Sequence, residues 1–144
     1  MRIIVDADAC PALNLIEKTA SSFNIEAIYF CDNTHNIKSD YAKVIIADKG
    51  YQNVDMLISN SLKKDDILVT QDYGLALIAL TKNANALHPK GTIYTNESLD
   101  IMLTERHINA TLRRNGVKTK GPKKRTNFDD INLIDSLEKL INGK

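Results

Sequence analysis

The chain has 144 residues, of which 43% are hydrophobic and 26% charged, and its formal net charge is +1. A chain of this length buries enough surface to fold as one domain without a metal or disulfide staple. Its apolar runs are all shorter than the roughly 20 residues that a membrane-spanning helix needs. Asp6 and Asp8 interrupt the start of the chain, which excludes the apolar core of a signal peptide there. We therefore expect a single domain over residues 1–144, located in the cytoplasm, with no membrane partner.

The first half of the chain alternates strand patterns with helix patterns. Short runs rich in β-branched residues indicate buried strands, and apolar residues at helical spacing indicate the helices between them. A helix between two strands implies a parallel crossover. The elements predicted here are a strand at Arg2–Asp6, a helix at 11–24, strands at Glu26–Cys31 and Lys43–Asp48, a helix at Val54–Leu62 and a strand at Asp66–Thr70.

The second half adds a short strand and three helices. The predicted elements are a helix that Asp72 caps, a fifth strand at Thr92–Thr95, a helix from Leu99 to about Asn115 capped by Asn96 and ended by Gly116, and an amphipathic helix between Phe128 and Ile141. The last helix should pack back on the body. This alternation predicts a three-layer α/β fold, with a mainly parallel sheet of about five strands flanked by helices.

Four aspartates are placed where the predicted strands end. Asp6 and Asp8 follow the first strand, Asp55 opens the helix after the third, and Asp72 follows the fourth. Parallel sheets bind ligands at the carboxyl ends of their strands, and clustered carboxylates repel one another unless a cation neutralises them. The pattern therefore predicts Mg²⁺ or Mn²⁺ at this edge, an arrangement suited to phosphodiester hydrolysis by a metal-activated water. Asp6, Asp8 and Asp72 are the candidate catalytic residues.

Each of these acids also has a structural interpretation. Asp72 could act only as a helix N-cap, and Asp55 could only complement a helix dipole. Asp6 and Asp8 favour the functional interpretation, because two acids at the end of a buried strand cost solvation energy unless they are partnered. The remaining acids near strand ends are interpreted as loop or turn residues: Asp48, Asp65 and Asp66.

Cysteine and histidine give little support to other chemistry. Cys10 and Cys31 are the two cysteines, and without a secretion signal we expect no disulfide between them. Cys10 is interpreted as a small buried residue of the turn. His35, His88 and His107 lack the paired spacing of a zinc site, so any metal should be held by oxygen.

Residues 113–126, RRNGVKTKGPKKRT, form a strongly basic segment that we call the basic arm. It contains seven Lys or Arg and no acid, whereas the rest of the chain carries a net charge of −6. Glycines and a proline predict a loop, and the lack of aromatic residues favours phosphate contact over base stacking. Arg113 and Arg114 could instead complement a helix dipole. The candidate phosphate-binding residues of the arm are Arg113, Arg114, Lys118, Lys120, Lys123, Lys124 and Arg125.

Three segments carry a resemblance to a known family. VDADACP (Val5–Pro11), LVTQDYGLA (Leu68–Ala76) and LRRNGVKTKGP (Leu112–Pro122) closely resemble three motifs of the bacterial YaiI/YqxD family of uncharacterised proteins, in the same order and spacing across nearly the whole chain. This family resembles the PIN and NYN group of α/β domains, in which three or four acids bind divalent metal for RNA cleavage. The resemblance thus implies a PIN-like fold, RNA as partner and nuclease activity.

The resemblance also bears on individual residues. Asp6 matches the acid that ends the first strand of the PIN and NYN pattern, and Asp72 matches the acid beyond the fourth strand. KGYQNVD is similar to the lysine-to-aspartate stretch of NYN nucleases, which adds Lys49 as a phosphate-binding candidate and supports Asp55. Gln52 stands where some relatives carry another acid, a departure that puts a full four-acid, two-metal site in doubt.

Two other functions fit parts of the sequence. The stretch DADAC resembles the start of haloacid-dehalogenase-type phosphatases, with Asp6 as nucleophile and Asp8 as acid, although that family has threonine or valine where Cys10 stands. Lys49 and Asp72 match its later lysine and acidic residues only loosely. A non-catalytic module that binds RNA or a ribosomal surface through the basic arm is the third hypothesis.

Overall fold

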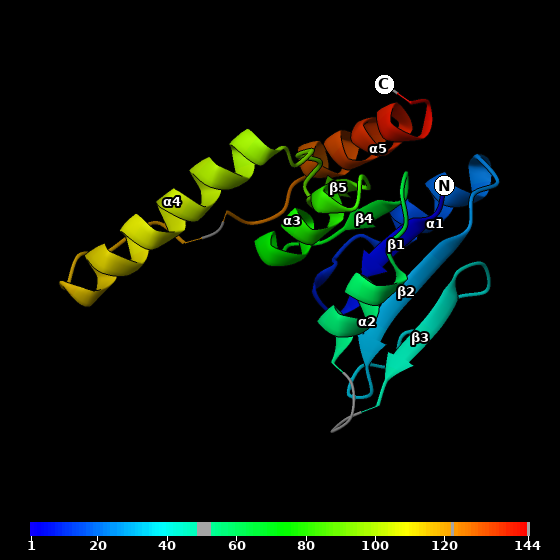
Figure 1. The fold of residues 1–144 in the computed structure, drawn as a ribbon, viewed down its shortest axis with the longest axis horizontal. Coiled ribbons are helices and arrows are strands. Elements are labelled where there is room, and N and C mark those ends of the chain that lie inside the picture. Colours follow the sequence, from blue (N-terminus) through cyan, green and yellow to red (C-terminus); the bar gives the residue numbers. More distant parts are fainter. Residues whose placement is uncertain (49–52, 122, 144) are drawn as a thin grey trace.

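The computed structural model describes residues 1–48, 53–121 and 123–143 and contains a twisted sheet with helices on both faces (Figure 1). The five strands of this sheet are all parallel, in the order β3-β2-β1-β4-β5. Their bounds are Ile3–Asp6 for β1, Ala27–Asp32 for β2, Lys43–Ala47 for β3, Ile67–Val69 for β4 and Asn85–Leu87 for β5. The predicted three-layer α/β fold with a parallel sheet is thereby confirmed.

Helices cover the sheet in two groups. Their bounds are Ala7–Ala9 for the short 3₁₀ helix η1, Leu13–Ser22 for α1, Val54–Ser61 for α2, Tyr73–Thr81 for α3, Asn96–Arg114 for α4 and Asn127–Ile141 for α5. One hydrophobic core lies between the sheet and α1 with α5, and a second lies between the opposite face and α2 with α3. None of the described helices is long and apolar enough to cross a membrane.

The central strand shows why the sheet is buried on both faces. Ile3, Ile4 and Val5 of β1 are all fully buried. Successive side chains of a strand point to opposite faces, so Ile3 and Val5 enter the core beneath α1 and α5, whereas Ile4 enters the core beneath α2 and α3. A continuous apolar run is therefore the sequence pattern of this strand.

The fifth strand lies elsewhere than the sequence predicted. β5 is Asn85–Leu87, which pairs in parallel with β4, while the predicted strand at Thr92–Thr95 contributes only an isolated antiparallel bridge between Ile93 and Leu87. The chain turns after β5 and doubles back, so that the Tyr94 amide donates to the Ala86 carbonyl at 2.9 Å. β5 has only three residues, one of them Asn85, so its sequence lacks the apolar run from which a strand is predicted. Its pairing with β4 makes it a strand.

Helix α5 closes the fold by packing on α1 and on the turn after β5. Leu133 and Leu137 of α5 are fully buried. Gly91 has a φ of +97°, and a Cβ added there would come within 2.5 Å of the Asn132 backbone. Ser136 Oγ donates to the Gly91 carbonyl at 2.5 Å. A glycine is thus required at this close approach of the turn to α5.

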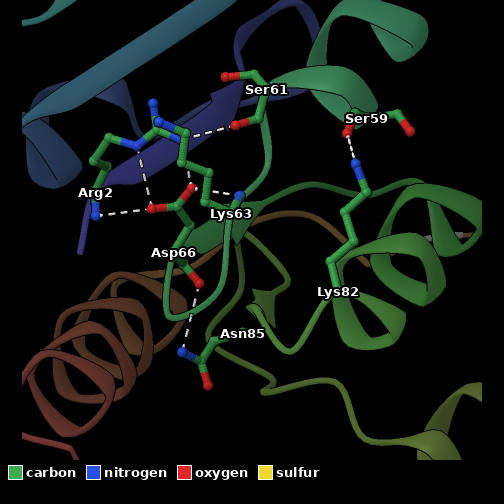
Figure 2. A network of polar contacts seen from close by, with 7 residues as sticks. All are labelled: Arg2, Ser59, Ser61, Lys63, Asp66, Lys82 and Asn85. Atoms are coloured by element: carbon green, nitrogen blue, oxygen red, sulfur yellow. Dashed lines mark hydrogen bonds and ion pairs between the residues drawn. The ribbon is translucent and has the colours of Figure 1, made fainter.

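The amino ends of the strands carry a polar network that has no counterpart among the predicted site residues (Figure 2). Arg2 Nη2 lies 2.6 Å from Asp66 Oδ2 and also donates to the Ser61 carbonyl at 2.8 Å. The Lys63 amide donates to the same Asp66 oxygen at 2.9 Å, and the side chain of Asp66 is almost fully buried. Asp66 is therefore a structural anion just before β4, on the edge opposite the candidate site.

Candidate functional site

The carboxyl edge of the sheet holds the four aspartates predicted from the sequence. Asp6 is the last residue of β1 and Asp8 lies in η1, directly after that strand. Asp55 lies in the first turn of α2, which follows β3, and Asp72 is the N-cap residue of α3, which follows β4. Three strand ends therefore contribute acids to one edge, because the parallel strands all end on the same side of the sheet.

Asp6 lies at the electrostatic centre of this group. The pKa of Asp6 is raised to about 6, mainly by burial and also by the charges of Asp55, Asp8 and Asp72, against the opposing effect of one hydrogen bond. That bond comes from Thr70 Oγ1, which donates to Asp6 Oδ2 at 3.1 Å. The negative charge of Asp6 is thus poorly compensated by the protein.

Asp55 and Asp72 line the same surface pocket between α2 and α3. Burial raises the pKa of Asp55, and the charge of Asp72 adds to this effect. Asp72 Oδ1 accepts hydrogen bonds from the amides of Gly74 at 2.8 Å and Leu75 at 3.2 Å. The predicted N-cap role of Asp72 is thereby confirmed, and because both bonds use Oδ1, the second carboxylate oxygen remains free of the cap.

Asp8 joins a second group of polar side chains that the sequence did not predict. Asp8 Oδ2 accepts from the Asp32 amide at 3.0 Å, and its Oδ1 lies 2.9 Å from His35 Nδ1. His35 Nδ1 also lies 3.1 Å from Asp32 Oδ1. Hydrogen bonds from Thr34 and His35 lower the pKa of Asp32 to about 2, and the bond to Asp32 raises the pKa of His35.

One ligand atom from each of Asp8, Asp32 and His35 lies within 4.8 Å of the others, so the three could also share a cation. Asp32 ends β2 and could have been found by the same strand-end reasoning that found Asp6. His35 could not, because the histidines of this chain lack the regular spacing of a metal motif.

The basic arm begins at the end of α4 and returns along the molecule to α5 (Figure 1). The lysines of the arm are all exposed: Lys118, Lys120, Lys123 and Lys124. Arg113 and Arg114 lie in the last turn of α4, where they donate to Thr119 Oγ1 and Thr111 Oγ1, respectively, both at 3.1 Å. Lys49 lies outside the described residues.

Arg125 differs from the rest of the arm because the fold already uses its charge. Its guanidinium lies 2.8 Å from Asp130 Oδ1 and donates to the Pro89 carbonyl at 2.8 Å, and the side chain is largely buried. The charge of Arg125 also acts on Cys10, which follows η1. The carboxyl-terminal end of the arm is thus anchored near the edge that carries the aspartates.

The two cysteines are free thiols, and Cys31 is fully buried within β2. Burial raises the pKa of the Cys10 thiol, which opposes formation of a reactive thiolate. The interpretation of Cys10 as a packing residue of the turn agrees with its partly buried position beside the core.

A family model described as "Uncharacterized BCR, YaiI/YqxD family" matches residues 4–143. The chain belongs to this family. A UPF0178 protein of Clostridium novyi is 53% identical over 142 residues, which cover 99% of this chain and 95% of the relative. A UPF0178 protein of Clostridium tetani is 49% identical over 141 residues, covering 98% and 97% of the two chains. No solved structure matches significantly.

Membership of the YaiI/YqxD family confirms the resemblance seen in the three motifs. The match to the family model extends from β1 through α5, so the acidic edge and the basic arm both lie within the matched region. The names of these relatives specify no reaction. The function therefore has to be inferred from the geometry of the carboxyl edge.

Proposed function

We propose that this chain is a divalent-metal-dependent phosphodiesterase of PIN-like fold that cleaves RNA. The observation that carries this proposal is the environment of Asp6, a largely buried carboxylate whose pKa is raised to about 6 by burial and by three neighbouring aspartates. A protein gains nothing in stability from such crowding, because each added charge opposes ionisation of the others. A divalent cation that binds the ionised acids offsets this cost.

The donor set fits a hard cation. Asp6, Asp8, Asp55 and Asp72 provide carboxylate oxygens, which Mg²⁺ and Mn²⁺ prefer over softer ligands. Thr70 holds Asp6 through its hydroxyl, and the same hydroxyl accepts from the Asp72 amide at 3.0 Å. This threonine thus connects the ends of the adjacent strands β1 and β4 and orients the acids there, Asp6 and Asp72.

A bound Mg²⁺ or Mn²⁺ would polarise a phosphodiester and lower the pKa of a coordinated water. Within the chain, Asp6, Asp8 and Asp72 would orient the reacting groups. The exposed lysines of the basic arm would hold phosphates of the bound RNA, since phosphate contacts position a nucleic acid without reading its sequence. The basic arm returns to α5 near the same edge, through Arg125, which supports this arrangement.

The phosphatase hypothesis has less support from the site. Asp8, which would have to act as acid, is held between the Asp32 amide and His35. A non-catalytic RNA-binding module accounts for the arm but not for the crowding around Asp6.

The test combines metal binding with cleavage. Wild-type protein should bind Mn²⁺ in calorimetric titrations and cleave single-stranded RNA only when Mg²⁺ or Mn²⁺ is present. Asp6→Asn conserves shape but removes a ligand charge, and should weaken Mn²⁺ binding and cleavage by at least about tenfold. Asp40→Asn is the matched control, because Asp40 is an exposed acid shortly before β3, at the opposite edge. RNA binding without metal binding or cleavage would instead assign the chain to the non-catalytic module.

A further inference from the structure

Helix α4 extends away from the body for much of its length (Figure 1). Of the 19 residues from Asn96 to Arg114, Leu99 alone is fully buried. Isolated helices of this length are marginally stable in water, because their stability normally comes from packing an apolar face. The exposed part of α4 is therefore stabilised less by packing than the other helices are.

An apolar stripe runs along the side of α4 that faces away from the body. Ile101, Ile108 and Leu112 are 60%, 50% and 36% exposed. Their spacing of seven and four residues places them on one face of a helix. Leu99 precedes Ile101 by two residues, or about 200° of rotation, so its buried side chain lies on the opposite face. The stripe is thus exposed because it lies on the face of α4 opposite the one that carries Leu99.

The charges of α4 are divided between its two halves. Residues 96–105 contain three acids and no base, namely Glu97, Asp100 and Glu105. Residues 106–114 contain three arginines and no acid, namely Arg106, Arg113 and Arg114. Two such helices packed antiparallel bring each acidic half against a basic half, whereas a parallel arrangement brings like charges together.

We propose that α4 is a dimerisation helix, whose apolar stripe packs antiparallel against α4 of a second copy of this chain. A twofold axis near the middle of the helix satisfies both observations at once, because it places Ile101 of one copy towards Leu112 of the other and opposes the charged halves. A polyanion is a poorer occupant of the stripe, since Glu97 and Glu105 flank it on the helix surface. The inference does not depend on the proposed nuclease activity.

Oligomeric state tests this proposal directly. In analytical ultracentrifugation at concentrations from about 1 to 200 μM, the mass should rise from 16.1 kDa towards twice that value. Ile108→Glu should remain monomeric over the whole range and keep its helical circular dichroism, because the substituted side chain is exposed in the monomer. Ile131→Glu is the matched control: Ile131 is an exposed isoleucine of α5, 57% accessible, and its variant should dimerise like wild type.

Orientation has a separate test. A short bifunctional maleimide should link a mixture of Ile101→Cys and Leu112→Cys proteins several times faster than either variant alone, with wild type as control for Cys10 and Cys31. Dimerisation should also weaken several-fold between about 50 and 500 mM salt, because opposed charges are screened. A mass of 16.1 kDa at every concentration, or a dimer that Ile108→Glu leaves intact, would overturn the proposal.

Discussion

Asp6 shows how one ionised side chain can be costly for the stability of the fold. Its folded-state pKa of about 6 lies above the ordinary value of 3.8. A group with a raised carboxyl pKa destabilises the fold where it must be ionised, so the cost is fully present above about pH 6 and declines as the pH falls towards 3.8. The contribution of Asp6 to the free energy of unfolding should therefore become less unfavourable as the pH falls from about 6 towards 3.8.

Asp6→Asn should reveal this cost in the metal-free protein. The amide oxygen can still accept from Thr70, and the charge is gone, so we expect the free energy of unfolding to rise by about 1 kcal/mol at pH 7.5 once solvent screening is allowed for. Urea denaturation at pH 7.5 and pH 4 measures the effect. The difference between variant and wild type should shrink at pH 4. Destabilisation by Asp6→Asn at pH 7.5 would make Asp6 a structural acceptor instead.

At the scale of one element, substitutions of Asp72 can distinguish its role as the N-cap of α3 from its proposed role as a metal ligand. Asn and Asp cap helices about equally well, whereas Ala loses the cap at a cost of about 1 kcal/mol. Asp72→Ala should therefore destabilise the protein by about that amount, through the lost bonds to Gly74 and Leu75. Asp72→Asn should keep the stability of wild type but bind Mn²⁺ at least about tenfold more weakly. Equal Mn²⁺ affinity of Asp72→Asn and wild type would leave Asp72 as a cap alone.

At the scale of the whole molecule, charge is separated between the basic arm and an acidic body. Seven of the 19 Lys and Arg residues lie in residues 113–126, and the rest of the chain carries −6. Concentrated cations repel one another, and a polyanion relieves that repulsion. The exposed lysines of the arm should accordingly contact RNA phosphates, whereas Arg125 is engaged with Asp130 and belongs to the fold.

Salt dependence measures those contacts. Each phosphate contact to a single strand contributes about 0.7 to the slope of log K against log salt. Replacing Lys118 and Lys120 with Ala should make the slope shallower by roughly 1 to 1.5, for any RNA sequence. Lys38 and Lys64 are exposed lysines near the opposite edge, and replacing both with Ala should leave the slope unchanged. Equal slopes for the two double variants would show that the arm makes no special contribution.

The sequence by itself determined the elements whose signal is local. The apolar runs of β1 to β4, the N-cap at Asp72 and the helix end at Gly116, with its φ of +80°, depend on neighbouring residues and appear where they were predicted. The edge that carries Asp6, Asp55 and Asp72 was predictable too, because parallel strands separated by helices all end on one side of a sheet.

The tertiary structure decided what depends on residues far apart in the chain. β5 is short and contains Asn85, so it becomes a strand only through its pairing with β4. The bond between Asp8 and the Asp32 amide spans 24 residues, and that between Arg125 and the Pro89 carbonyl spans 36. Local sequence patterns do not predict such contacts, because the energy of a buried polar group depends on the partners that the fold brings to it.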